Sequence, residues 1–123
     1  AIVMGAGLPL DLPDLTRDFP DVALIPILSD ARGVGIVVRK WLRRQRLPDA
    51  IIIEHPRHAG GHLGATRTGE IADPRFDFAR VLEEIPALLR ELGLEAEKIP
   101  LIVAGGIHRH DQVRELLGMG AAA

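Results

Sequence analysis

The sequence predicts an α/β fold in which parallel strands alternate with helices. Short apolar runs and longer amphipathic stretches take turns along the 123 residues, and glycine or proline separates most of them. Such alternation is typical of a parallel sheet with right-handed crossover connections. A full (β/α)8 barrel needs roughly 250 residues. The pattern therefore fits either half of such a barrel or a doubly wound open sheet.

Four apolar runs are predicted to be strands. They cover residues 1–4, 22–28, 50–54 and 101–104. The third run reads Ala-Ile-Ile-Ile, as expected of a strand buried on both faces. Residues 120–123 lead towards a further strand. Because the chain opens on a strand rather than on Met, we interpret residues 1–123 as the central to C-terminal part of one domain, truncated at both ends.

Helices are expected between these strands. Their predicted positions are residues 12–19, 34–42, 78–92 and 113–117. The first is weak at best because prolines bracket it. Asp30 is placed to cap the second, whose apolar residues follow the i, i+3, i+4 spacing. In the third, Pro86 predicts either a kink or a helix start.

Composition excludes several classes of protein. A net charge of −2 gives no electrostatic reason to expect a nucleic acid or an anionic membrane as partner. No apolar run approaches the ~18–20 residues that span a bilayer. The lack of cysteine excludes disulfides and thiolate ligands. We therefore expect a cytoplasmic protein without nucleic-acid or membrane partners, and leave a homo-oligomer open.

Ligand chemistry is expected at the carboxyl ends of the strands, where parallel α/β folds bind their ligands. Glycine there lets the backbone approach a ligand closely. A glycine turn that leads into a helix can also bind phosphate, although a tight turn without a ligand is the alternative. The residues at these strand ends are Gly5, Gly7, Ser29, Ala104, Gly105 and Gly106.

The loop after the third strand holds the most candidate residues. His62 is flanked by glycines, and imidazole can take or give a proton near neutral pH. On these residues alone, an exposed histidine without a role is an equal alternative. His55, His58 and His62 also offer three imidazoles to a zinc ion. Because Pro56 stiffens the loop and no helix aligns the three, we predict no metal site.

Two further groups are interpreted as surface residues. His108 and His110 lie at the entry to the last helix and need no function there. A basic cluster ends the second helix, where the helix dipole favours cations and solvent covers the outer face. Its members are Arg39, Lys40, Arg43, Arg44 and Arg46.

Two motifs taken together resemble the nitronate monooxygenases, formerly called 2-nitropropane dioxygenases. Ala-Gly-Gly-His-Leu-Gly at residues 59–64 follows a strand with an acidic end, and Ile-Pro-Leu-Ile-Val-Ala-Gly-Gly-Ile at residues 99–107 contains the next strand. The resemblance extends from Gly5 to Gly120. It implies a partial (β/α)8 TIM barrel, about half of one, within a single FMN-binding domain.

The resemblance also implies roles for individual residues. His62 matches the family's catalytic histidine, which acts as the base on the α-carbon of a nitroalkane. The turn after the fourth strand matches the phosphate-binding turn, and the loop before His62 matches the loop beside the flavin ring. Pro26 departs from the pattern, because some members carry a flavin-contacting lysine there. The residues implied to bind FMN are Gly5, Gly7, Ser29, Ala59, Gly60, Gly61, Ala104, Gly105 and Gly106.

The implied function is that of an FMN-dependent oxidoreductase, which oxidises alkyl nitronates or nitroalkanes with dioxygen. Flavin-dependent enoyl-acyl-carrier-protein reductases share the same two motifs and are the alternative enzyme. A non-catalytic barrel that binds FMN or phosphate is the alternative from another class. The chain alone is expected to be inactive, because half of the pocket lies elsewhere.

Overall fold

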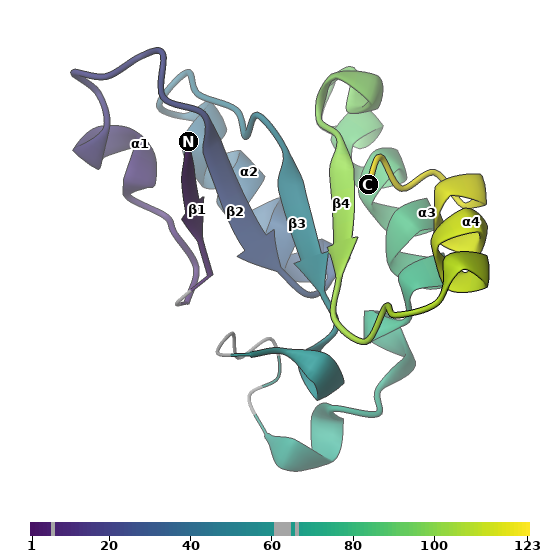
Figure 1. Ribbon diagram of the computed structural model, residues 1–123. Coiled ribbons are helices and arrows are strands. Elements are labelled where there is room, and N and C mark those ends of the chain that lie inside the picture. Colours follow the sequence, from purple (N-terminus) through teal and green to yellow (C-terminus); the bar gives the residue numbers. More distant parts are fainter. Residues whose placement is uncertain (6, 61–64, 66) are drawn as a thin grey trace.

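The computed structural model describes residues 1–123 except residues 6, 61–64 and 66. Strands and helices alternate along the chain, as Figure 1 shows. The strands are β1 (Ile2–Met4), β2 (Leu24–Leu28), β3 (Ile51–Glu54) and β4 (Leu101–Ala104). The α-helices are α1 (Leu12–Leu15), α2 (Ala31–Leu42), α3 (Phe78–Glu91) and α4 (His110–Gly118). Short 3-10 helices are η1 (Pro56–His58), η2 (Thr68–Glu70), η3 (Pro74–Phe76) and η4 (Ala96–Lys98).

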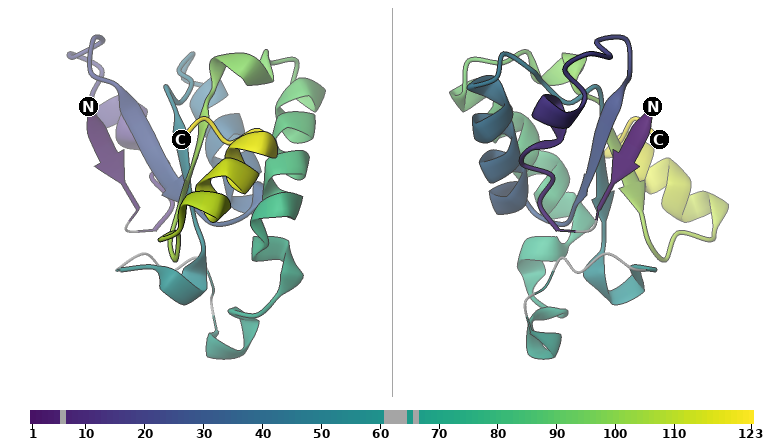
Figure 2. Two further views of the ribbon diagram at one scale, coloured as in Figure 1. Left: turned by 45° about the vertical axis from the view of Figure 1, so that its right-hand side comes forward. Right: turned by 90° about the vertical axis from the view of Figure 1, so that its left-hand side faces the viewer.

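The order of the strands decides between the two predicted architectures. All described pairings are parallel, and the strands lie side by side in the order β1-β2-β3-β4. When every right-handed crossover moves one strand in the same direction, all helices fall on one face of the sheet. A doubly wound sheet instead reverses direction at a switch point. The α/β prediction of a partial barrel is confirmed, and Figure 2 shows the twist of the sheet.

The last residues of the chain extend this sheet beyond β4. The N–H of Ala122 donates to the carbonyl of Leu101 (2.7 Å), and the N–H of Val103 donates to the carbonyl of Ala123 (2.9 Å). Alternating bonds of this kind join neighbouring parallel strands. The expectation that these residues lead into a further strand is therefore confirmed.

The hydrophobic core lies between the sheet and the helices. Burial alternates along β2 and β3, so that Ile51 and Ile53 are fully buried while Ile52 is half-buried. The expectation that the third strand is buried on both faces is wrong for this chain, because helices cover only one face. On that face Trp41 is fully buried, and its Nε1–H donates to the carbonyl of Pro9 (2.9 Å).

The first helix is shorter than predicted, the third closely matches its predicted range, and one predicted cap is confirmed. The weak first helix is only Leu12–Leu15, with Pro13 in its first turn. Helix α3 runs without interruption past Pro86, because a buried apolar stripe on both sides of the proline offsets a cost of about 3 kcal/mol. Asp30 caps α2 as expected, since its Oδ1 accepts the N–H of Gly33 (2.7 Å). No helix within the described residues is long and apolar enough to cross a membrane.

Candidate functional site at the carboxyl end of the sheet

The turn after β4 has the geometry expected of a ligand-binding turn. Gly105 and Gly106 have φ angles of 95° and 76°, which favour glycine. Among the residues that the structure describes, no acceptor lies within hydrogen-bond reach of the backbone N–H groups of Gly105, Gly106 and Ile107. These three donors precede the N-terminal end of α4. Such an arrangement suits an anionic group, and above all a phosphate.

Two histidines pack against this turn. A Cβ atom on Gly106 would lie 2.6 Å from Cδ2 of His58, so the imidazole occupies the space that any side chain would need. The N–H of His55 donates to the carbonyl of Ala104 (3.1 Å), which continues the pairing of β3 with β4 past the strand ends. The His55 and His58 rings lie 5.6 Å apart between centroids. From the sequence, His55 and His58 were candidates only for metal binding. The structure instead places both beside the glycine turn.

The surroundings of His55 favour its neutral form. Burial lowers its pKa, and electrostatic repulsion from the neighbouring His58 and Arg57 side chains lowers it further, while Asp77 opposes them. Its Nδ1 accepts the N–H of Arg57 (3.2 Å), which requires an unprotonated nitrogen. His55 therefore closes the start of the loop after β3 by acting as a hydrogen-bond acceptor.

The end of β2 contributes Ser29 and Asp30. Ser29 is buried, and its Oγ donates to the carbonyl of Glu54 (2.8 Å), which joins the carboxyl ends of β2 and β3. Asp30 forms the cap of α2. Ser29 thus lies at the predicted edge of the sheet, where its hydroxyl links two strands.

The end of β1 lies farther from the glycine turn. A Cβ atom on Gly5 would lie 2.8 Å from the Cβ of Ile27, so packing against β2 requires glycine there. Gly7 has a φ of 83° and donates its N–H to the carbonyl of Gly5 (3.1 Å). Three strand spacings separate β1 from β4, or about 14 Å. These glycines share an edge with Gly105 but do not contact it.

The loop that carries the predicted base is described only in part. Gly61 and His62 lie outside the described residues, so their predicted roles remain predictions. Ala59 follows η1 in an extended conformation, and Gly60 is exposed with open space beside its Cα.

Sequence reasoning missed Arg75, which reaches back from the same loop to the end of β2. Its Nη2 lies 2.9 Å from Oε2 of Glu70, and its Nε lies 3.7 Å from Oδ2 of Asp30. Its guanidinium also lies over the Phe76 ring, 4.6 Å from the centroid. The only signal in the sequence was the acidic residue that follows Ser29, since an arginine in a polar loop gives no indication of its partner.

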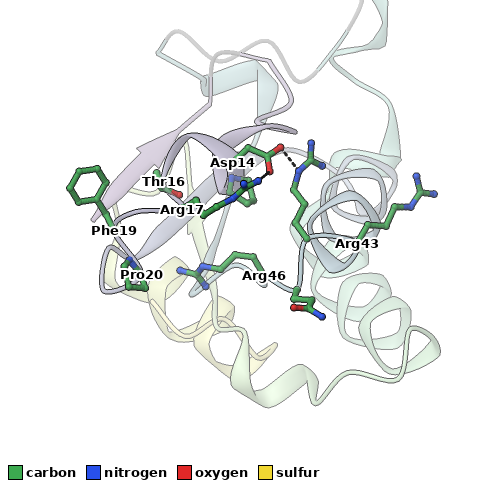
Figure 3. A pocket seen from close by; sticks show the side chains of 10 residues that line it. Asp14, Thr16, Arg17, Phe19, Pro20, Arg43 and Arg46 are labelled. Carbon is green, nitrogen blue, oxygen red and sulfur yellow. Dashed lines mark hydrogen bonds and ion pairs between the residues drawn. The ribbon is translucent and has the colours of Figure 1, made fainter.

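A second hollow, of about 510 Å³, lies at the opposite, amino end of the sheet (Figure 3). Arg44 pairs there with Asp14 and with Asp11 (2.8 Å), and Arg17 also pairs with Asp14 (3.1 Å). The interpretation of the basic cluster as a solvated surface is wrong for Arg44, which is mostly covered and joins α2 to the α1 region. Because these cations already bind carboxylates, we assign this hollow to stability.

A parallel sheet whose strands follow one another in sequence order, with helices between them, defines a segment of a (β/α)8 barrel. A family model described as nitronate monooxygenase matches residues 1–123. The chain therefore belongs to the nitronate monooxygenase family.

The fold is similar to part of a larger solved structure. It superposes on the crystal structure of nitroalkane oxidase from Streptomyces ansochromogenes with a TM-score of 0.59 and 19% sequence identity. The match covers 98% of this chain and 29% of that chain, so the chain spans less than a third of its length. At this identity the likeness establishes the fold alone. No curated protein sequence matches the chain.

Proposed function

We propose that the protein containing this chain is an FMN-dependent oxidoreductase that oxidises alkyl nitronates with dioxygen. The observation that carries this proposal is the family match over all 123 residues, which includes both glycine motifs. The nitroalkane oxidase of similar fold acts, by its name, on nitroalkanes, the conjugate acids of nitronates. In this proposal residues 1–123 form the central to C-terminal part of one FMN-binding barrel domain.

The turn after β4 suits the phosphate of such a cofactor. The N–H groups of Gly105, Gly106 and Ile107 offer donors that a dianion would accept, and the His58 ring against Gly106 keeps the turn narrow. The remaining flavin pocket is proposed to include the other residues that match the family. They are Gly5, Gly7, Ser29, Ala59, Gly60, Gly61 and Ala104.

The chain's own residues have two tasks in this proposal. A bound FMN supplies the redox chemistry, which no side chain of this chain can provide. The glycines let the backbone approach the cofactor closely, and their N–H groups orient it. His62 takes the proton from the α-carbon of a nitroalkane and so generates the nitronate.

Steady-state assays of the full-length protein test the proposal. We expect nitronate-dependent oxygen uptake and no NAD(P)H-dependent enoyl reduction. His62→Ala should lower nitroalkane turnover at least about a hundredfold, the range of general-base catalysis, while FMN stays bound. His110→Ala is the matched control, because His110 is exposed at the start of α4.

Three results would contradict this account. If His62→Ala turned over nitroalkanes as fast as wild type, His62 would not be the catalytic base. Enoyl reduction without nitronate oxidation would favour the alternative enzyme. Absence of flavin absorbance after reconstitution with FMN would remove the flavoenzyme assignment altogether.

A further inference from the structure

Both ends of the segment 55–77 are tied to the same two residues at the end of β2. The segment leaves β3 at Glu54, whose carbonyl accepts the hydroxyl of Ser29 (2.8 Å). It returns to α3 just after Arg75, whose Nε faces Oδ2 of Asp30 at 3.7 Å. Ser29 and Asp30 are adjacent, so one point of the sheet fixes the departure and the return of this segment.

Both residues at that point are tied to the fold. Ser29 is buried between two strands, and Asp30 uses its other carboxylate oxygen, Oδ1, to cap α2 through the N–H of Gly33 (2.7 Å). The Asp30 side chain is 18% exposed. The Arg75 side chain is 33% exposed, so the pair is partly covered and is screened less than a fully exposed surface pair.

Arg75 is held on several sides as well. Its Nη2 donates to Glu70 (2.9 Å), its guanidinium covers the fully buried Phe76 ring, and its backbone N–H donates to Oδ1 of Asp73 (2.9 Å). Among the described residues, its Nε is the buried side-chain polar atom without a hydrogen-bond partner. Asp30 is the carboxylate that faces this N–H in the described residues, so the ion pair with Asp30 links Arg75 to the start of α2 while Glu70 and Phe76 hold it within its own segment.

We propose that Arg75 is a positioning residue, whose ion pair with Asp30 holds the return arm of segment 55–77 against the start of α2. The chain between the two ties includes His62, so this role rests on the proposed function. A displacement of about 1 Å at a reacting group can cost a hundredfold in rate. Loss of the tie is therefore expected to lower kcat more than it raises KM.

The experiment uses the full-length, flavin-loaded protein and two readouts. Arg75→Met removes the charge but keeps the bulk, and Asp30→Asn keeps an acceptor for the N–H of Gly33. Arg80→Met is the matched control, because Arg80 is exposed and pairs only with Glu84 among the described residues. The first readout is the rate of trypsin cleavage after Arg67, and the second is kcat and KM for a nitroalkane.

For Arg75→Met we expect several-fold faster cleavage after Arg67 and at least about a tenfold lower kcat. Asp30→Asn should act in the same direction, and the double variant should be no worse than the worse single variant, because both changes remove one interaction. Arg75→Lys should recover part of kcat, and it replaces Arg75→Met if that variant does not fold.

If trypsin cleaved Arg75→Met after Arg67 at the wild-type rate, the ion pair between Arg75 and Asp30 would not hold this segment in place. Faster cleavage with kcat within about twofold of wild type would overturn the positioning role, as would additive losses in the double variant. The cleavage readout needs no flavin. A protein that never binds flavin would therefore contradict the proposed function and leave the tie to be judged by cleavage.

Discussion

The two ends of the sheet are built for different purposes. At the amino end, Asp49 accepts the N–H of Leu24 (2.7 Å) and the guanidinium of Arg46 (2.5 Å), and Arg44 binds two further carboxylates. At the carboxyl end, the N–H groups of the Gly105–Gly106 turn and the Nε of Arg75 have no hydrogen-bond partner among the described residues. At the amino end these polar groups are paired with one another, and at the carboxyl end the N–H groups of the glycine turn are left available to the proposed ligand.

This difference separates stability from function. In barrels of this kind the carboxyl ends of the strands carry the active site and the amino ends carry stability. The arginine-rich hollow at the amino end is larger than the hollow of about 280 Å³ beside His55, His58 and Gly106. Size therefore does not identify the site. The chemical state of the lining groups is more informative, since Arg17, Arg44 and Arg46 at the amino end are already paired with carboxylates.

The largest expected effect on cofactor binding is at the glycine turn. Gly106→Ala places a Cβ atom 2.6 Å from His58 at a φ of 76°, and such strain costs of order 1–3 kcal/mol. We expect FMN affinity to fall at least about tenfold, as measured by flavin fluorescence titration of the full-length protein. Gly118→Ala is the control, because a Cβ atom there meets nothing within 4 Å. Equal affinities in the two variants would refute the role of the turn.

A smaller effect is expected from pH at the same end of the sheet. Burial lowers the pKa of His55 below its ordinary value of 6.5, so the folded protein favours the neutral ring. The stability that follows is complete above pH 6.5 and is lost as pH falls through the folded pKa. Urea unfolding between about pH 7.5 and about pH 5.5 should show a steeper decline for wild type than for His55→Gln. Parallel declines would contradict this prediction.

The smallest effect is expected at the amino end. Burial raises the pKa of Asp49, but hydrogen bonds from Arg46 and from the N–H of Leu24 outweigh it, so the pKa lies below 3.8. This group stabilises the fold above pH 3.8, and the contribution is lost as pH falls through the lowered pKa. Asp49→Asn should cost less than about 1 kcal/mol at neutral pH, because solvent screens the pair. FMN affinity should not change in Asp49→Asn. A tenfold loss of affinity would contradict the claim that the amino end of the sheet serves stability alone.

Local patterns predicted the fold well. Apolar runs and helical stripes located the strands and helices, and Asp30 capped α2 as its position indicated. The strand-end rule also placed Ser29 and Gly105 at one edge of the sheet. The helix does not begin at Pro86, because the buried apolar stripe on both sides of the proline keeps Phe78–Glu91 in one helix. The short α1 reflects the same limit, since few residues of that region reach the core.

Side-chain contacts between distant segments were not predictable. Nothing near His58 indicates that its ring packs on Gly106, and nothing near Arg75 indicates Asp30 as its partner. Such contacts depend on the exact path of a long loop. The spacing of apolar residues, which predicts helices and strands, does not determine that path. The glycine motifs and their order carried the family resemblance, and the family match over residues 1–123 confirms it.

The central claim is that the turn after β4 binds the phosphate of a flavin. The most direct test compares the binding of FMN and riboflavin, which differ only in that phosphate, to the full-length apoprotein. We expect FMN to bind at least about tenfold more tightly, and Gly106→Ala to abolish most of this difference. Equal affinity for the two flavins, or a preference that survives in Gly106→Ala, would contradict the account.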